Sequence, residues 1–280
     1  MKAKHLNLRL LTLFIVSNFL MLSCEESDTI QDAEQISVEE TLALVEADDI
    51  SDEVNNIIDA YFAFEEGFAS KERDENKTNT LDCLTKTTET SGNSKTVILD
   101  FGEGCALPNG NILSGKIILN YAKDIDVHSL SVTYTFEDFN FNDRSIEGEN
   151  AMVRIRENEH GNPQSTLNFN VKITWIDGEI TTRVGTKVRE WVEGFDTWNL
   201  GDNVFLITGN WTVTHIDSTT SSANIIEPLR REMACRFIVS GIIELVKNEK
   251  SGTLNFGDGT CDNKGIYTNI DGEEKEIILR

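Results

Sequence analysis

The chain has 280 residues and a formal net charge of −23, from 48 acidic and 25 basic side chains. This balance argues against nucleic acid and anionic lipid surfaces as partners, because both repel an acidic protein. The length is sufficient for one large all-β domain or for two smaller domains, each with its own core.

Residues 1–23 have the composition of a bacterial export signal. Three basic residues precede an apolar run over residues 10–22, which is short for a membrane span. Ser23 then precedes Cys24, and this junction resembles the lipobox of bacterial lipoproteins, in which the cysteine is acylated and becomes the first residue. We therefore expect a lipid such as palmitate on Cys24 and a location at the outer membrane, on its periplasmic or cell-surface face. A plain signal peptide cut nearby and an uncleaved anchor are the alternatives.

The next segment is predicted to hold a tether and two short helices. Residues 24–36 are acidic, polar and aperiodic, which is typical of a flexible tether. Residues 37–69 predict the helices: Ser37 and the glutamate three residues later form a capping box, and Ser51 with two following acids opens the second helix. Residues 70–80 form a charged linker.

Residues 81–280 predict a mainly β domain. Threonine, valine, isoleucine and aromatic residues alternate with polar ones, and Gly, Asn-Gly or Asp-Gly pairs interrupt the runs at hairpin spacing, giving about a dozen strands. Asp177-Gly178 between two alternating runs is the clearest hairpin signal. This pattern predicts an antiparallel β meander, folded as a sandwich or as a curved, partly closed barrel.

Four cysteines lie in this domain, and an even count in an exported chain indicates disulfides with three possible pairings. The segments LDFGEGC and LNFGDGTC repeat one pattern, and each closes a hairpin that another cysteine opens. Partner strands at the open end of a hairpin lie about 5 Å apart, within reach of a disulfide. We therefore predict Cys83–Cys105 and Cys235–Cys261. The rival pairing joins Cys83 to Cys235 and Cys105 to Cys261, and the absence of zinc-ligand spacing disfavours a structural zinc site.

Several of these segments also carry a family resemblance. TVILDFGEGC with the following NGNILSGKIIL, EPLRREMACRFIVSGIIEL and LNFGDGTCDN resemble an uncharacterised family of predicted Bacteroidota lipoproteins, in particular through ACRFIVSG and FGDGTCDN. The resemblance covers most of the chain after the linker. It implies the localisation and fold class given above, and it brings no activity and no site residues.

The residues that could carry chemistry are scattered. His128, His160 and His215 lie near no serine- or cysteine-based motif, and HExxH is absent, so we expect no catalytic residue. The acidic turns at 100–103 and 258–263 offer oxygens to calcium but lack the spaced set of an EF-hand-like loop. We expect them to be ordinary turns, with no metal and no cofactor bound.

Trp198 lies in a Gly-containing loop and is the residue we expect as a possible ligand contact. Trp175 and Trp211 lie on amphipathic strands and fit a core position instead. Arg230 and Arg231 are expected on a solvated turn.

These observations predict a non-enzymatic binding, adhesion or structural protein of the bacterial envelope. Its partners would be the membrane, through the N-terminal lipid, and a possible glycan or protein ligand, with no nucleic acid. One alternative is a carbohydrate-active hydrolase, which needs a deep cleft with two facing carboxylates. The other is a carrier for an apolar ligand, which needs a curved sheet with an unfilled apolar concave face.

Overall fold

The computed structural model describes residues 36–65, 83–92, 94–107, 110–122, 129–196 and 200–279. They belong to one unit, Glu34–Arg280, whereas Met1–Ala33 form a separate unit outside the described residues. The predicted export signal, nearly all of the tether and the linker therefore lie outside the part that the structure describes.

Within the described residues, one helix, α2 (Val38–Glu65), precedes the strands. The capping box is present: the Ser37 N–H donates to Glu40 Oε2 at 2.9 Å, and the Glu40 N–H donates to Ser37 Oγ at 3.1 Å. The prediction of two short helices over 37–69 is wrong, because α2 runs through Ser51 without a break. Ser51 Oγ donates to the carbonyl of Ala47 at 3.0 Å within the helix, so its hydroxyl does not cap a second one.

The described chain after the helix is built of fourteen strands and one short 3-10 helix. Their bounds are β1 (Thr85–Ser91), β2 (Ser94–Asp100), β3 (Cys105–Ala106), β4 (Ile112–Ala122), β5 (Ser129–Phe141), β6 (Arg144–Ile155), β7 (Gln164–Thr174), β8 (Ile180–Glu193), η1 (Leu200–Asp202), β9 (Val204–His215), β10 (Thr220–Glu232), β11 (Ile238–Lys247), β12 (Lys250–Asp258), β13 (Lys264–Thr268) and β14 (Glu274–Ile278).

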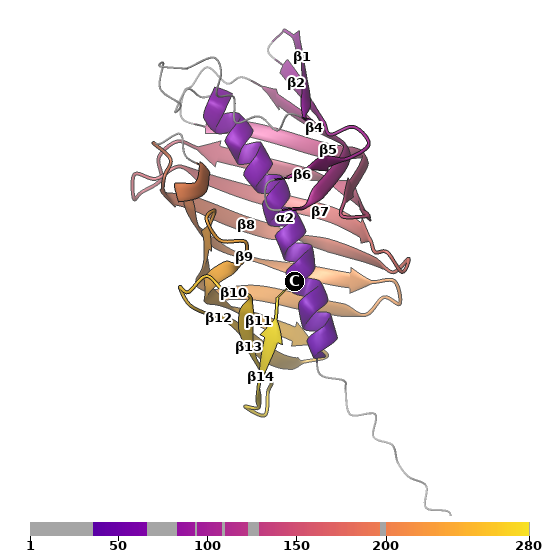
Figure 1. The fold of residues 1–280 in the computed structure, drawn as a ribbon, viewed down its shortest axis with the longest axis vertical. Helices are drawn as coiled ribbons and strands as arrows, with labels where there is room; N and C mark the ends of the chain where they lie inside the picture. Colours follow the sequence, from indigo (N-terminus) through magenta and orange to yellow (C-terminus); the bar gives the residue numbers. More distant parts are fainter. Residues whose placement is uncertain are drawn as a thin grey trace, which may run out of the picture. The chain divides into compact units, whose positions relative to one another are not determined.

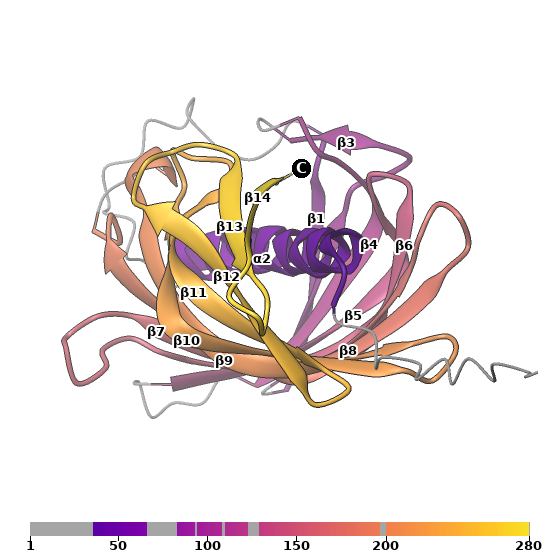
Figure 2. The same cartoon turned by 90° about the horizontal axis from the view of Figure 1, so that it is seen from below.

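All fourteen strands form one antiparallel sheet in chain order, with β3 paired to β4 beside the main path. The prediction of a mainly β, antiparallel meander is confirmed. The sandwich is wrong, because the described strands make one sheet instead of two. That sheet is strongly curved and is not closed into a barrel (Figure 2).

The curvature gives the sheet an inner face, which α2 covers (Figures 1 and 2). On β5, Val132 and Tyr134 point inward and are buried, whereas Ser131 and Thr133 are exposed on the outer face, as strand alternation requires. The Tyr134 hydroxyl donates to Asn55 Oδ1 of α2 at 3.1 Å, which ties the helix to this face.

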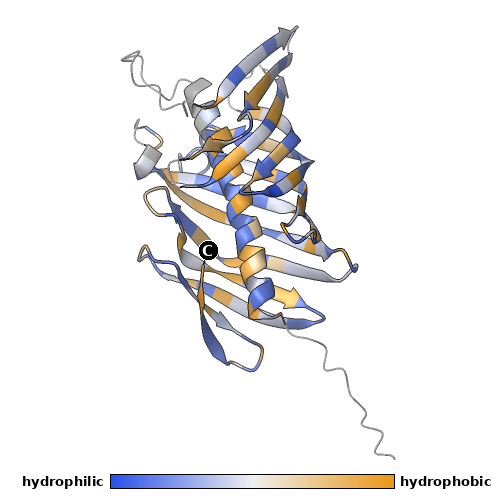
Figure 3. Cartoon of the chain, turned by 45° about the vertical axis from the view of Figure 1, so that its right-hand side comes forward, coloured by the Kyte–Doolittle hydropathy of each residue, from blue (hydrophilic) through white to orange (hydrophobic). Residues whose placement is uncertain are grey.

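A single apolar core lies between α2 and the sheet. Inward residues of the strands, such as Leu119, Ile207 and Leu254, pack in it and are fully buried. Hydrophobic and hydrophilic residues nonetheless alternate along α2 (Figure 3). The helix and Ile36, just before it, supply these buried apolar residues to the core: Ile36, Leu44, Val45, Ala47, Ile50, Val54, Ile58 and Tyr61.

Candidate functional site

Buried ion pairs join α2 to the centre of the inner face. Arg183 and Lys187 of β8 are completely buried. Arg183 Nη2 and Lys187 Nζ lie 2.7 Å and 2.6 Å from the same Oδ1 of Asp48, and Lys187 Nζ lies 3.2 Å from Asp52 Oδ1. Removal of Asp48 would leave Arg183, and removal of Lys187 would leave Asp52, without its ion-pair partner at this site, and an unpaired buried charge is costly.

A second group of buried ion pairs lies further along α2, at Asp59. Arg154 Nη1 of β6 lies 2.8 Å from Asp59 Oδ1, and Arg189 Nη1 of β8 lies 3.5 Å from Asp59 Oδ2. Arg189 also donates through Nη2 to Asn56 Oδ1 at 2.5 Å. The charged groups therefore join the helix to the sheet by direct contacts at two places along α2.

Two neighbouring carboxyl groups on α2 are perturbed in opposite directions. Burial raises the pKa of Asp48, but Lys187 and Arg183 outweigh burial and hold that pKa below its ordinary value. Burial raises the pKa of half-buried Asp49 to about 8, against the attraction of Arg231 and with the help of the neighbouring acids. Adjacent residues of one helix thus differ in charge at neutral pH.

Among the described residues, little open space lies between α2 and strands β9, β11 and β12. A cavity of about 10 Å³ remains between α2 and β9–β12, near Trp211, which is about the volume that one water occupies. An apolar ligand needs a pocket of several hundred Å³. The packed inner face therefore weighs against the carrier alternative.

The candidate residues identified from the sequence lie in different parts of the chain and form no common site among the described residues. Cys24, His128 and Trp198 lie outside the described residues. Trp211 is buried, as predicted, and Trp175 is half-buried, with its indole N–H donating to Thr181 Oγ1 at 3.1 Å. Trp191, seven residues before Trp198, is buried against Phe205 and so is no exposed platform.

The two described histidines belong to different places. His160 Nδ1 lies 2.9 Å from Glu190 Oε1, and His215 Nδ1 lies 3.3 Å from Glu179 Oε1. Glu179 and Glu190 flank opposite ends of β8, so these pairs do not converge on one centre.

The acidic turns use their carboxylates on their own backbones. Asp100 Oδ1 accepts the Gly102 N–H at 2.9 Å, Asp258 Oδ1 accepts the Thr260 N–H at 3.2 Å, and Asp262 Oδ1 accepts the Lys264 N–H at 3.0 Å. The Thr260 hydrogen bonds hold the pKa of Asp258 below its ordinary value. Within the described residues, no three His, Cys, Asp or Glu side chains are grouped so as to hold a metal ion.

Two disulfides close the hairpins that were expected to carry them. Cys83 bonds to Cys105 with a Cα–Cα distance of 5.4 Å, and Cys235 bonds to Cys261 with a distance of 5.7 Å. The rival pairing is therefore not the one that the structure contains. Arg231, just before the second disulfide, is buried and donates to the carbonyl of Arg236, so the expected solvated position is wrong for this residue.

The outer face of the sheet carries a row of aligned polar side chains. The strand register pairs Asn168 with Thr186, Thr186 with Asn210, and Asn210 with Asn224 on adjacent strands. Thr186 Oγ1 donates to Asn168 Oδ1 at 2.7 Å across the strands. The same register continues to β2 through the following residues: Ala151, Thr133, Asn120 and Thr96.

The centre of this face contains no charged side chain. Lys172, Glu190 and the exposed Glu227 bound the uncharged region on the same strands. We call this region, on β7–β10, the outer patch. Its members are Thr166, Asn168, Asn170, Thr182, Val184, Thr186, Val188, Thr208, Asn210, Thr212, Thr214, Ser222, Asn224 and Ile226.

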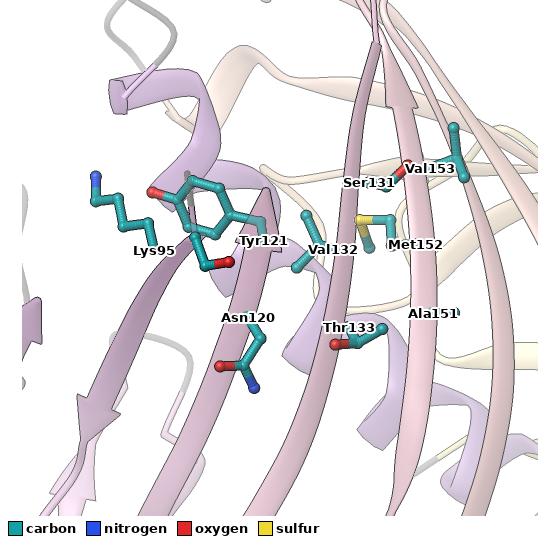
Figure 4. A pocket seen from close by; sticks show the side chains of 10 residues that line it. Lys95, Asn120, Tyr121, Ser131, Val132, Thr133, Ala151, Met152 and Val153 are labelled. Atoms are coloured by element: carbon teal, nitrogen blue, oxygen red, sulfur yellow. The ribbon is translucent and has the colours of Figure 1, made fainter. Parts of the chain in front are cut away.

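A shallow hollow of about 550 Å³ adjoins the outer patch at β2–β6 (Figure 4). Asn120, Thr133 and Ala151 of that row line it, and Val153, 43% exposed, adds apolar surface. The polar row and the hollow make the outer face the candidate functional surface of the chain.

Comparisons with protein-family models, with curated proteins and with solved structures find no match for this chain. Across the described ranges, no helix is both long enough and apolar enough to cross a bilayer.

Sequence reasoning missed the outer patch, although its signal is present. Within the outer patch, the outward residues of β7, β8 and β9 are threonine, asparagine and valine, where a chain of this acidity would be expected to place charges. That depletion of charge over neighbouring strands becomes visible only once the strand register is known.

Proposed function

We propose that this chain is an exported, lipid-anchored, non-enzymatic binding protein of the bacterial envelope, and that its outer patch holds an uncharged, hydroxyl-rich ligand such as a neutral glycan. The observation that carries the proposal is the lack of charged side chains in the outer patch of a chain whose net charge is −23. A charged ligand would find no counter-charge on this surface.

The chemistry of the outer patch supports an uncharged polar ligand. Threonine hydroxyls and asparagine amides both donate and accept hydrogen bonds, as sugar hydroxyls do. Neighbouring strands lie about 4.8 Å apart and alternate residues of a strand about 6.8 Å apart, so the groups repeat regularly over the face. Val184 is 51% exposed within the outer patch and offers apolar contact to the C–H side of a ring.

Export and anchoring are supported by separate features. The junction at Cys24 resembles a lipobox, and two disulfides are typical of proteins in oxidising compartments. The hydrolase alternative gains no comparable support, because no carboxylate lines the hollow on the outer face.

Affinity electrophoresis through gels that contain neutral or acidic polysaccharides tests the binding. We expect retardation by a neutral polysaccharide, weakened about thirtyfold by Asn210→Ala with Asn224→Ala, because each truncation removes hydrogen-bonding capacity worth about 1 kcal/mol. The matched control is Ser251→Ala with Thr253→Ala on β12, on the same face but outside the outer patch. Equal loss in both double variants, or binding to acidic polysaccharides alone, would contradict the proposal.

The anchor is tested independently of the ligand. Radiolabelled palmitate should enter the wild-type chain in growing bacteria and should be absent from Cys24→Ser. A labelled Cys24→Ser chain, or an unlabelled wild type, would remove the lipid from the proposal.

A further inference from the structure

Five described loops share one hydrogen-bond pattern, and three of these, all at hairpin tips, also share an Ile-Asp pair. The segments Trp175–Glu179, His215–Thr219 and Asn269–Glu273 read WIDGE, HIDST and NIDGE. In each, the first N–H donates to the last carbonyl, at 2.8, 2.9 and 3.0 Å, and the fourth N–H donates back to the first carbonyl. The fourth residue has a positive φ in all three, 87°, 67° and 81°, which glycine tolerates best.

Each of these loops exposes an isoleucine at its second position. Ile176, Ile216 and Ile270 are 69%, 68% and 53% exposed. A single exposed apolar residue is ordinary on a protein surface, but three at equivalent positions of equivalent loops form a pattern. We call these three residues the isoleucine rim.

The three tips lie at the same ends of the strands. Thr181 pairs with His215, which places the first two tips side by side. Ser221 pairs with Lys247 and Thr253 pairs with Thr268, so the third tip follows around the same curved edge of the sheet.

The described chain also begins at this edge. Glu40 Oε1, in the first turn of α2, lies 2.5 Å from Lys247 Nζ, and the Tyr267 hydroxyl donates to the Ile36 carbonyl at 3.3 Å. Thirty-five residues precede Ile36, and the twelve steps of chain from Cys24 span at most about 40 Å. A lipid on Cys24 would therefore tether the edge that carries the isoleucine rim.

We infer that the isoleucine rim contacts the surface of the bilayer to which the N-terminal lipid is tied. This inference rests on the lipid anchor of the proposed function and adds an orientation: the strand ends at this edge face the membrane. Isoleucine gains free energy on leaving water, so each of these tips can contribute to contact with a bilayer interface.

Charge decides which lipid the isoleucine rim accepts. Asp177, Asp217 and Asp271 follow the three isoleucines directly. Thr219 hydrogen bonds hold the pKa of Asp217 below its ordinary value, so this carboxylate stays ionised beside Ile216. Acidic tips are repelled by anionic headgroups, and the inferred surface is therefore one of zwitterionic lipid.

Quenching by brominated phosphatidylcholine tests the contact. The full lipidated chain is reconstituted in phosphatidylcholine vesicles, and the signal of Trp175, next to Ile176, is taken as the difference between wild type and Trp175→Phe. We expect quenching of Trp175, lost in Ile176→Ser with Ile216→Ser and Ile270→Ser. The control is Ile226→Ser, whose isoleucine is 49% exposed on the outer face and away from this edge; it should quench like wild type.

Each outcome has one meaning. Unquenched Trp175 in the wild type, or quenching that Ile226→Ser removes and the triple variant keeps, overturns the inference. A triple variant that keeps its quenching but changes from dimer to monomer in analytical ultracentrifugation would make the isoleucine rim an interface between copies, which also overturns it. Intact mass reports acylation of Cys24 separately, so loss of the anchor and loss of rim contact are distinguishable.

Discussion

The ion pairs of Asp48 give the most direct test of how α2 is held on the sheet. Asp48→Asn replaces a carboxylate that lies within 2.7 Å of two completely buried cations, Arg183 and Lys187. Arg183 retains Ser51 Oγ and a backbone carbonyl, and Lys187 retains Asp52. Breaking a buried pair while its partner stays typically costs 3–5 kcal/mol, and these remaining contacts place our expectation at about 3 kcal/mol.

Urea unfolding with the disulfides intact measures this change. We expect the midpoint to fall while the m-value stays constant, because the surface exposed on unfolding is the same. The matched control is Glu137→Gln, which breaks the Lys116–Glu137 pair, 2.5 Å long but exposed on the outer face; its midpoint should stay at the wild-type value. A midpoint for Asp48→Asn equal to that of the control would refute the reasoning, since it would mean that water compensates the two cations.

Three further predictions concern single features of the fold. The pKa of Asp49 is raised to about 8 in the folded chain, so the unfolded chain loses this proton at lower pH than the folded chain does. Asp49 therefore lowers the free energy of unfolding progressively from about pH 4 to pH 8. Asp49→Asn should stabilise the fold at pH 8 and not at pH 4, which urea unfolding at both pH values measures. Cys235→Ser with Cys261→Ser opens a disulfide with a sequence separation of 26 and should cost about 3 kcal/mol in the same assay, whereas a loss below 1 kcal/mol would show that the reduced hairpin retains its structure. Gly185→Ala places a methyl group 2.4 Å from Cβ of buried Trp211 and should cost about 1–3 kcal/mol with an altered near-ultraviolet circular dichroism signal; an unchanged spectrum would mean that the strands separate freely there.

Local signals predicted those parts of the fold that depend on neighbouring residues. Ser37 and Glu40 start the helix because their contacts lie within one turn. Asp177-Gly178 forms a hairpin tip, as the dipeptide indicates. The four cysteines pair within their own hairpins, because each disulfide needs only the register of adjacent strands.

The polarity of β8 could not be predicted in this way. Its alternating faces are Arg183, Lys187 and Arg189 on one side and Val184 and Val188 on the other. Hydropathy alone would put the valines in the core, whereas the structure buries the three cations and leaves Val184 51% exposed. The reason lies more than 120 residues away, in aspartates and an asparagine of α2 that no local pattern connects to this strand.

The continuity of α2 and the outer patch were missed for the same reason, because both depend on contacts between residues far apart in the sequence. The acidic run around Ser51 resembles the first turn of a new helix, but Asp48 and Asp52 are buried partners of the sheet and Ser51 Oγ bonds within the helix and to Arg183. Burial of the cations of β8 on the inner face leaves threonine and valine for the outer face. The uncharged outer patch is thus in part a consequence of the charged interior.

Whether these buried charges stabilise α2 or specify its position can be decided with one pair. Lys187→Met alone should destabilise by about 3 kcal/mol, because it leaves Asp52 buried without its cation. Lys187→Met with Asp52→Leu removes both charges and keeps the Arg183–Asp48 pair, and apolar replacements of this kind are often neutral or stabilising. We therefore expect the double variant to unfold near the wild-type urea midpoint while the amides of α2 exchange faster, since apolar contacts tolerate sliding of the helix and ion pairs do not. A double variant as unstable as Lys187→Met, with unchanged exchange in α2, would show that the charges act through stability and leave the helix register to the apolar core.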